Sequence, residues 1–190
     1  PHQSEQTFIA ANIPIINPAG VQEYLDLGVL GFALSRYSGC ALGFKALGDT
    51  VESSASVSID PHRININTNI DFDMPDEGLN IRWPDPPQDK ENRLILQKLP
   101  AAHAFARVNQ LDRIIFDSPK PRLGIVTTGK AYLDVMQAFD ELGLTKEMAA
   151  ELGIRLYKVA MTWPLEPLGA KEFSDGLESI LVVEEKRPLI

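Results

Sequence analysis

The chain has 190 residues, 44% of them hydrophobic and 23% charged, which is close to the average of soluble globular proteins. Its formal net charge of -8 makes nucleic acid and anionic membrane surfaces poor partners. The single cysteine, Cys40, excludes an internal disulfide and a complete iron–sulfur ligand set, and the three histidines lack metal-ligand spacing. No apolar run approaches a membrane span of about 18 residues and no secretory signal opens the chain, so we expect a cytoplasmic protein.

Residues 1–70 predict a partial α/β unit. Residues 8–16 form an apolar segment, in which Pro14 is expected to keep its neighbours extended. Asn17-Pro18 is a helix-start signal, and the helix that follows is expected to end at Gly39. This helix is apolar around nearly its whole surface, which indicates that it is buried or covered by another chain. Short β segments are expected at residues 41–47, 54–59 and 63–66.

Residues 71–120 predict a connector with helices. Its first part, residues 71–88, is rich in proline, aspartate and asparagine. This part is too long for an ordinary loop, so we expect it to cross the surface between two units. Residues 89–116 predict helical structure, interrupted at Pro100, with apolar side chains at helical spacing.

Residues 121–190 predict a doubly wound α/β domain, in which continuous apolar strands alternate with helices and form a parallel sheet. Strands are expected at residues 121–129, 154–159 and 179–184, and helices at residues 130–142, 146–152 and 170–177. The fold class is therefore α/β, with a partial α/β unit and a long connector before the doubly wound domain.

Two polar segments and one lysine are candidates for a site. Thr127-Thr128-Gly129-Lys130 lies at a strand-to-helix turn, where backbone N–H groups can hold an anion; the alternative is a tight turn into a packed helix. It is not a Walker loop, because the glycine loop is too short and Ala131 follows the lysine. Glu184-Glu185-Lys186-Arg187 follows a strand at the edge where α/β folds bind ligands, or is simply a charged strand end. Lys45 can reach a phosphate or remain solvated.

Several segments together resemble one family, in collinear order over essentially the whole chain. They are Pro18–Tyr24, Ala33–Gly39, Asp49–Val57, Gly78–Arg82, Ala104–Arg107, Leu123–Tyr132, Gly153–Val159, Met161–Pro167 and Val182–Arg187. These segments resemble the indolepyruvate ferredoxin oxidoreductases, within the 2-oxoacid:ferredoxin oxidoreductase family. The resemblance implies the end of a pyrimidine-binding thiamine diphosphate domain at residues 1–70, and a domain similar to the C-terminal domain of transketolase at residues 121–190.

The resemblance also implies a reaction, the oxidative decarboxylation of an arylpyruvate with coenzyme A and ferredoxin. Thiamine diphosphate, Mg²⁺ and iron–sulfur clusters would serve the intact enzyme. His2 and Glu5 resemble the end of a family motif near the cofactor, and Thr128, Gly129 and Lys130 are the other candidate cofactor-binding residues. No catalytic residue or metal ligand is assigned, and no cofactor is expected on this chain alone.

Three interpretations of the chain stay open. In the first, it is an internal segment of the enzyme, inactive alone, that provides scaffold and contacts to the remaining domains; a start without methionine and an end after a strand favour this expectation. In the second, it is a self-standing α/β module that binds coenzyme A or a nucleotide at the turn of residues 128–130. In the third, it forms a homodimer through the glycine-bearing helix at residues 18–36.

Overall fold

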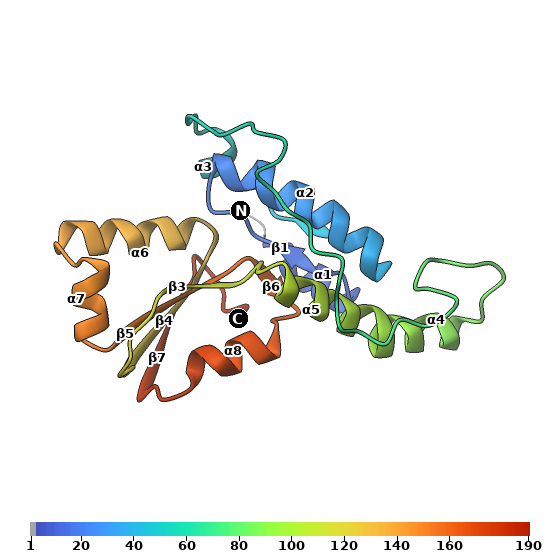
Figure 1. Cartoon of the computed structure of the whole chain (residues 1–190). Helices are drawn as coiled ribbons and strands as arrows, with labels where there is room; N and C mark the ends of the chain where they lie inside the picture. Colours follow the sequence, from blue (N-terminus) through green and yellow to red (C-terminus); the bar gives the residue numbers. More distant parts are fainter. Residues whose placement is uncertain (1–2) are drawn as a thin grey trace.

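Two β-sheets organise the chain, and helices lie around each of them (Figure 1). The computed structural model describes residues 3–190. A three-stranded sheet, the small sheet, has the strand order β2-β1-β6, and a four-stranded sheet, the main sheet, has the order β3-β5-β4-β7. The small sheet joins distant parts of the sequence, because β6 (Met161–Trp163) pairs antiparallel with β1 (Ile15–Ile16).

The main sheet confirms the parallel arrangement predicted for residues 121–190. β4 (Leu123–Thr128) lies between β5 (Ile154–Val159) and β7 (Ser179–Val183) and runs parallel to both. Strands of this kind are apolar along their whole length because helices can cover both of their faces. The doubly wound α/β fold is therefore present.

A fourth strand of the main sheet is absent from the sequence prediction. β3 (Arg113–Phe116) runs antiparallel to β5 at one edge, so the helical prediction for residues 89–116 is wrong over its last four residues. The preceding helix ends before Gln110, which has a φ of 51°, and the β-branched pair Ile114-Ile115 suits a half-buried strand.

Helices cover both faces of the main sheet (Figure 1). α6 (Gly129–Glu141) and α7 (Lys146–Glu151) lie on one face, and α8 (Pro167–Ser174) lies on the other. All three were expected from the sequence, although α8 begins three residues earlier than the pattern suggests. Its early start has a local cause, because the side chain of Glu166 accepts hydrogen bonds from the first backbone N–H groups of the helix.

Successive side chains of β4 point to opposite faces and fill two separate cores. Ile125 packs in the core beneath α6 with Phe139, whereas Val126 packs in the core beneath α8 with Phe173. This alternation is the period of a β-strand. Each fully buried side chain of this size stabilises the fold by about 1.5–3 kcal/mol.

The first unit contains one long helix, α2 (Val21–Ser38), and the small sheet. α2 ends at Gly39, whose φ of 68° is left-handed, as the sequence predicts. The predicted cap at Asn17 is wrong: Gly20 occupies the cap position, and the Asn17 side chain instead donates a hydrogen bond to Thr128.

Two other segments of this unit form short elements. The apolar segment at residues 8–16 contains the end of the helix α1 (Glu5–Ala10) and, directly after Pro14, the strand β1. The strand expected at residues 41–47 shortens to β2 (Gly43–Phe44), and the helix α3 (Gly48–Val51) follows it.

After α3, no residue in the range 52–86 lies in a helix or a strand. The prediction of β segments at residues 54–59 and 63–66 is therefore wrong. The segment is instead held to α2 by side chains. Gln22 exchanges hydrogen bonds with the backbone of Ser58, and Arg63 pairs with Asp26. An alternating sequence forms a strand only where a neighbouring strand is available, and here a helix is the neighbour.

A continuous helical region follows the connector. α4 (Pro87–Arg93) passes through a π-helical turn, η1 (Leu94–Lys98), into α5 (Leu99–Val108). The π-helical turn directly precedes Pro100, whose missing N–H would otherwise break the hydrogen-bond ladder. α5 packs against α2 through a core that includes Phe105, Leu34 and Met161 of β6.

A buried ion pair also ties the first unit to the main sheet. Lys158 of β5 pairs with Glu23 of α2, and its Nζ lies 4.6 Å from the ring centroid of Tyr132. Burial lowers the pKa of Lys158 to about 8, whereas the adjacent Glu23 carboxylate favours the charged lysine. The two units therefore share sheet pairing, apolar core and a charge pair.

Candidate functional site

The carboxyl ends of β4 and β7 border a small cavity of about 80 Å³, here called the edge cavity. It brings together two of the cofactor-binding residues expected from the sequence, Glu5 and Thr128, with Lys45 and the segment of residues 184–187. Such a position, at the carboxyl edge of parallel strands, is where α/β folds bind ligands.

Several polar groups of the edge cavity are paired with one another, but the buried amide oxygens of Gln3 and Asn17 have no hydrogen-bond partner among the described residues. Asn17 Nδ2 donates to Thr128 Oγ1 at 3.2 Å. Lys45 Nζ lies 2.7 Å from Glu5 Oε1 and 3.8 Å from Glu185 Oε2. The Glu5 side chain is only 4% exposed, so Lys45 neutralises a buried carboxylate rather than standing free for a phosphate.

Gly129 and Lys130, the other two candidate residues of the strand-to-helix turn, do not line the edge cavity. Gly129 has a φ of 54°, and a Cβ at this position would lie 2.5 Å from Asn17 Nδ2, so Asn17 fills the space above the turn. Lys130 binds Asp134 one turn along α6 at 2.8 Å, and this hydrogen bond raises the pKa of Lys130. His2 lies outside the described residues. A role of these residues in cofactor binding stays a prediction.

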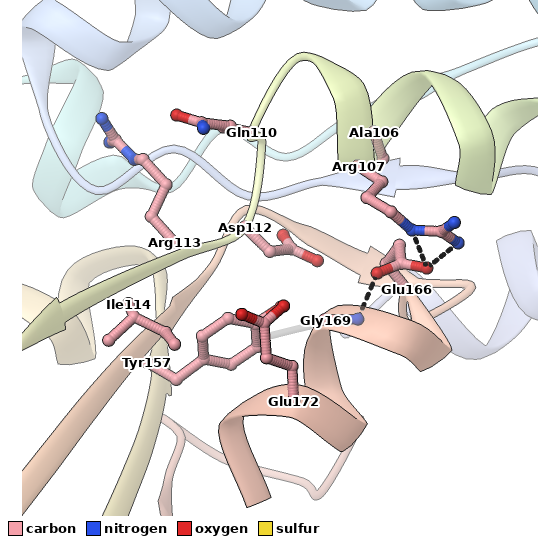
Figure 2. Close-up of a pocket in the computed structure, with 10 residues that line it drawn as sticks. All are labelled: Ala106, Arg107, Gln110, Asp112, Arg113, Ile114, Tyr157, Glu166, Gly169 and Glu172. Atoms are coloured by element: carbon pink, nitrogen blue, oxygen red, sulfur yellow. Dashed lines mark hydrogen bonds and ion pairs between the residues drawn. The ribbon is translucent and has the colours of Figure 1, made fainter. Parts of the chain in front are cut away.

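A larger cavity of about 340 Å³ lies between α5, β3, β5 and α8, and is here called the Asp112 cavity (Figure 2). Its lining is mainly polar and includes Arg107, Gln110, Asp112, Arg113, Tyr157, Glu166 and Glu172. None of these residues is a candidate in the sequence analysis. The cavity is assembled from residues 106–114 and residues 157–172, two segments that are far apart in the sequence.

Asp112 fixes the backbone between β5 and β6 by hydrogen bonds. Its Oδ1 accepts the backbone N–H groups of Ala160 at 2.7 Å and Met161 at 2.9 Å. Its Oδ2 is buried and has no hydrogen-bond partner among the described residues. Burial raises the pKa of Asp112 to about 6, against the lowering effect of the two amides, and nearby Glu166 raises it further.

Glu166 forms the second fixed carboxylate of the Asp112 cavity. It caps α8 through the N–H groups of Leu168 and Gly169 and accepts from Arg107 Nε at 3.1 Å (Figure 2). Burial alone would raise the pKa of Glu166, but Arg107 and the two amides outweigh it, so the pKa is lowered. Glu166 is therefore a charged group with its bonds directed to the protein.

Tyr157 provides a hydroxyl beside these carboxylates. Burial raises its pKa, and the charges of Asp112, Glu166 and Glu172 raise it further, so the phenol stays neutral. A Cβ at Gly169 would lie 2.8 Å from Tyr157 Oη. The glycine thus leaves room for the hydroxyl at the wall of the cavity.

The sequence holds few signals for this cavity. Asp112 lies in a stretch with a helical pattern, where a lone aspartate suggests a solvated surface. Glu166 stands between two prolines and before a helical segment, which is a cap signal that could have been recognised. Their proximity depends on how β6 crosses to the small sheet, which no local pattern shows.

The described residues do not fit the redox cofactors that the family resemblance implies. Cys40 is buried, and burial raises the pKa of its thiol, so it is a poor source of thiolate. Within residues 3–190, no three His, Cys, Asp or Glu side chains are grouped so that they could hold a metal ion. None of the helices in this range is long and apolar enough to cross a bilayer.

Comparison with known sequences relates the second half of the chain to one family. Residues 113–190 match a family described as the indolepyruvate oxidoreductase domain. Indolepyruvate oxidoreductase subunit IorA of Methanothermobacter marburgensis is 30% identical over 93 residues, which cover 49% of this chain and 14% of that protein. The IorA subunit of Methanothermobacter thermautotrophicus is 28% identical over 99 residues, which cover 52% of this chain and 15% of that protein. The matches thus span about a seventh of each relative.

A solved structure shares the fold. It is a 2-oxoglutarate:ferredoxin oxidoreductase from Magnetococcus marinus with 2-oxoglutarate, coenzyme A and succinyl-CoA bound. The similarity has a TM-score of 0.50 at 9% sequence identity and covers 92% of this chain and 35% of that chain. It extends over both sheets, whereas the family match is confined to residues 113–190.

Proposed function

We propose that the chain is a structural part of a 2-oxoacid:ferredoxin oxidoreductase, because its residues 113–190 match the indolepyruvate oxidoreductase domain family. The matched relatives are oxidoreductase subunits, and the fold is shared with a 2-oxoacid:ferredoxin oxidoreductase. The role of the chain in this proposal is to position the neighbouring domains of the enzyme rather than to carry the reacting groups.

In the proposed reaction, the intact enzyme converts an arylpyruvate and coenzyme A to an acyl-CoA. The bond to the carboxylate breaks and releases carbon dioxide, the thiol of coenzyme A loses its proton to solvent as the thioester bond forms, and two electrons pass to ferredoxin. Thiamine diphosphate supplies the carbanion chemistry in such enzymes. We assign this cofactor, Mg²⁺ and the iron–sulfur clusters to other parts of the enzyme, because a single buried cysteine and the scattered carboxylates here do not fit them.

The observation that carries the scaffold role is the exposed apolar surface of strand β7. β7 lies at an edge of the main sheet, and Ile180, Leu181 and Val182 are 47%, 52% and 43% exposed. An apolar edge strand left open in this way is prone to pair with another chain, so natural proteins cover it. A further domain of the same enzyme is the occupant that the proposal requires.

The structure of the edge cavity supports the same role. In a ligand-binding domain, the carboxyl edge of the sheet is open to the ligand. Here Asn17 lies above Gly129, and Lys45 is paired with Glu5. A cavity of about 80 Å³ is also far smaller than a nucleotide or coenzyme A requires.

Calorimetry on the 190-residue chain tests the proposal. Titration with coenzyme A, and separately with thiamine diphosphate and Mg²⁺, should give no binding at micromolar concentrations. Micromolar binding of either cofactor would contradict the scaffold role. It would favour the alternative, a self-standing module that binds at residues 128–130.

One observation supports the self-standing module, and a pair of variants can test it. Lys45, Lys186 and Arg187 line the edge cavity together with Thr128, so three cations border one space. If coenzyme A does bind, Lys45→Met should abolish binding, whereas Lys130→Met, on a lysine directed to Asp134, should preserve it. The opposite result would place the ligand at the turn itself.

Self-association is the third role considered. α2 exposes Leu25, Val29 and Phe32 at helical spacing, and the Phe32 side chain is 79% exposed. A Cβ at Gly28, on the same side of the helix, would meet nothing within 4 Å. If these residues form a homodimer, Phe32→Asp should convert a dimer to a monomer in sedimentation velocity. If the unaltered chain is already a monomer, the exposed apolar face of α2 would instead be assigned to contacts with a neighbouring domain.

A further inference from the structure

The side chains that face the Asp112 cavity carry an excess of negative charge. Arg107 is bonded to Glu166, so these two charges cancel. The guanidinium of Arg113 points away from Asp112 and lies 3.5 Å from Glu23 (Figure 2). Asp112 and Glu172 are left without a cation in the cavity. An acidic space of this kind attracts a cation.

Asp112 Oδ2 is the atom that most needs a partner. It is buried and unpaired among the described residues, whereas Oδ1 of the same carboxyl group accepts two amides. A buried acceptor without a donor loses the hydrogen bonds that it makes to water in the unfolded chain. A ligand that brings an N–H donor into the cavity would restore such a bond.

The other walls suit an organic ligand rather than a bare metal ion. Ala106, Ile114 and the ring of Tyr157 supply apolar surface, and the neutral Tyr157 hydroxyl can accept a further N–H. The volume of about 340 Å³ lies in the range of small-molecule sites, about 300–1,000 Å³. No three ligand side chains in residues 3–190 are close enough to hold a metal.

We propose that the Asp112 cavity binds a small organic cation, whose ammonium, amidinium or guanidinium group donates to Asp112 Oδ2 and Glu172. The head group lies between these carboxylates and beside the Tyr157 hydroxyl, and its organic body contacts Ala106 and Ile114. This site is separate from the edge cavity. It does not depend on the proposed role of the chain in a 2-oxoacid oxidoreductase.

Three probes of one shape and different charge test the proposal. Benzamidine is a cation, benzamide is neutral and benzoate is an anion. Each is titrated into the 190-residue chain while NMR follows the backbone amides of Ala160, Met161 and Gly169, which donate to the carboxylates of Asp112 and Glu166. Benzamidine should shift these amides and bind at least tenfold tighter than benzamide, and benzoate should not bind. Tighter binding of benzoate, or no shift with benzamidine at millimolar concentrations, would overturn the proposal.

Variants locate the binding to the named carboxylates. Asp112→Asn should weaken benzamidine binding at least tenfold at neutral pH, whereas Asp134→Asn, on the exposed side of α6, should leave it unchanged. Glu172→Gln, an exposed change on α8, provides a second test if Asp112→Asn disturbs the fold, and should weaken binding severalfold. Unchanged affinity in both cavity variants would contradict the site.

The pH dependence gives a further readout. Benzamidine remains a cation throughout this range, so its affinity should rise about tenfold from pH 5 to pH 7 as Asp112 ionises. Asp112→Asn should remove this rise. The other charged or titratable groups near Asp112 are Arg107, Arg113, Tyr157, Glu166 and Glu172. A rise that persists in the Asn variant would assign it to one of these groups and overturn the role of Asp112.

Discussion

The edge cavity and the Asp112 cavity differ in how their polar groups are satisfied. In the edge cavity, Asn17 Nδ2 binds Thr128 and Lys45 pairs with the buried Glu5 carboxylate, although the amide oxygens of Gln3 and Asn17 lack partners among residues 3–190. In the Asp112 cavity, a buried carboxylate oxygen has no partner among residues 3–190. The edge cavity has the position expected of a ligand site and a lysine paired with its buried carboxylate, whereas the Asp112 cavity has a carboxylate oxygen that no group of the described residues satisfies. The position of a cavity in the fold therefore indicates where a ligand site is expected, and the unsatisfied polar groups of the cavity indicate the chemistry of the ligand.

The largest effect should come from filling the space above the turn of the edge cavity. Gly129→Ala places a Cβ 2.5 Å from Asn17 Nδ2 and forces an alanine into a φ of 54°. The combined strain and crowding should lower the free energy of unfolding by about 3–4 kcal/mol in urea denaturation.

Gly143→Ala is the matched control for this substitution. Gly143 has a similar φ of 63°, but a Cβ there would meet nothing within 4 Å. Gly143→Ala should therefore lower the free energy of unfolding only through the strained backbone of the alanine, by about 1 kcal/mol. Equal losses in the two variants would show that Asn17 does not hold the edge closed.

The next effect concerns the pH dependence of stability at the Asp112 cavity. The pKa of Asp112 is raised from 3.8 to about 6 in the folded chain, so the folded state binds the proton more tightly than the unfolded state. The free energy of unfolding should therefore fall by about 2–3 kcal/mol from this group as the pH rises from 4 to 7.

Asp112→Asn should remove this component. The difference in unfolding free energy between the variant and the unaltered chain, measured across that pH range, isolates it from other titrating groups. Asp134→Asn, an exposed change, should give a curve parallel to that of the unaltered chain. A difference that does not vary with pH for Asp112→Asn would refute the raised pKa.

A third effect tests whether the ion pair of the edge cavity is structural. Lys45→Met leaves the buried Glu5 carboxylate without its cation and should cost about 2 kcal/mol in denaturant unfolding. Adding Glu5→Gln should recover most of this loss, because the uncompensated charge is then gone. Lys130→Met, which breaks an exposed pair with Asp134, should cause no measurable change.

The smallest expected change in stability comes from substitutions of the two adjacent threonines at the end of β4. Thr128→Val removes the acceptor of the Asn17 amide and should cost about 1 kcal/mol. Thr127 is fully buried, but its hydroxyl has no partner among the described residues, so Thr127→Val should be neutral or stabilising. Thermal denaturation of the two variants should therefore separate them, and a larger loss at Thr127 would indicate an unseen partner.

The sequence predicts the main sheet well because its signals are local. The runs at residues 123–128 and 154–159 are continuous and apolar, and glycines end the helices between them. A strand of this kind has few alternatives, since only a parallel sheet covered on both faces can bury it. The antiparallel β3 lacks such a signal, because it continues a helical pattern.

The same local reasoning fails over residues 54–66. Alternation such as Arg63-Ile64-Asn65-Ile66 is compatible with a strand, but no strand edge lies beside it. The side chains of Gln22 and Asp26 on α2 bind the segment instead. Whether an alternating sequence becomes a strand is decided by a partner that is distant in sequence.

The candidate sites show a similar division. The sequence places Glu5 and Thr128 among its candidates, and the structure brings them to one cavity. It does not indicate that Asn17 lies above Gly129, since the residues are more than a hundred positions apart. Asp112 is missed because its burial depends on Ala160 and Met161, which reach it only through the crossing of β6.

The pairing of β6 with β1 has a consequence for any attempt to divide the chain. Residues 113–190 include Met161–Trp163, yet the strand that these residues pair with lies at Ile15–Ile16. A protease cut within the connector, between residues 71 and 86, should therefore leave two pieces that still elute together from a sizing column. Expressed separately, the second piece would carry β6 without its partner strand, the first would expose the edge of β1 that β6 covers, and both would expose part of the shared core and tend to precipitate.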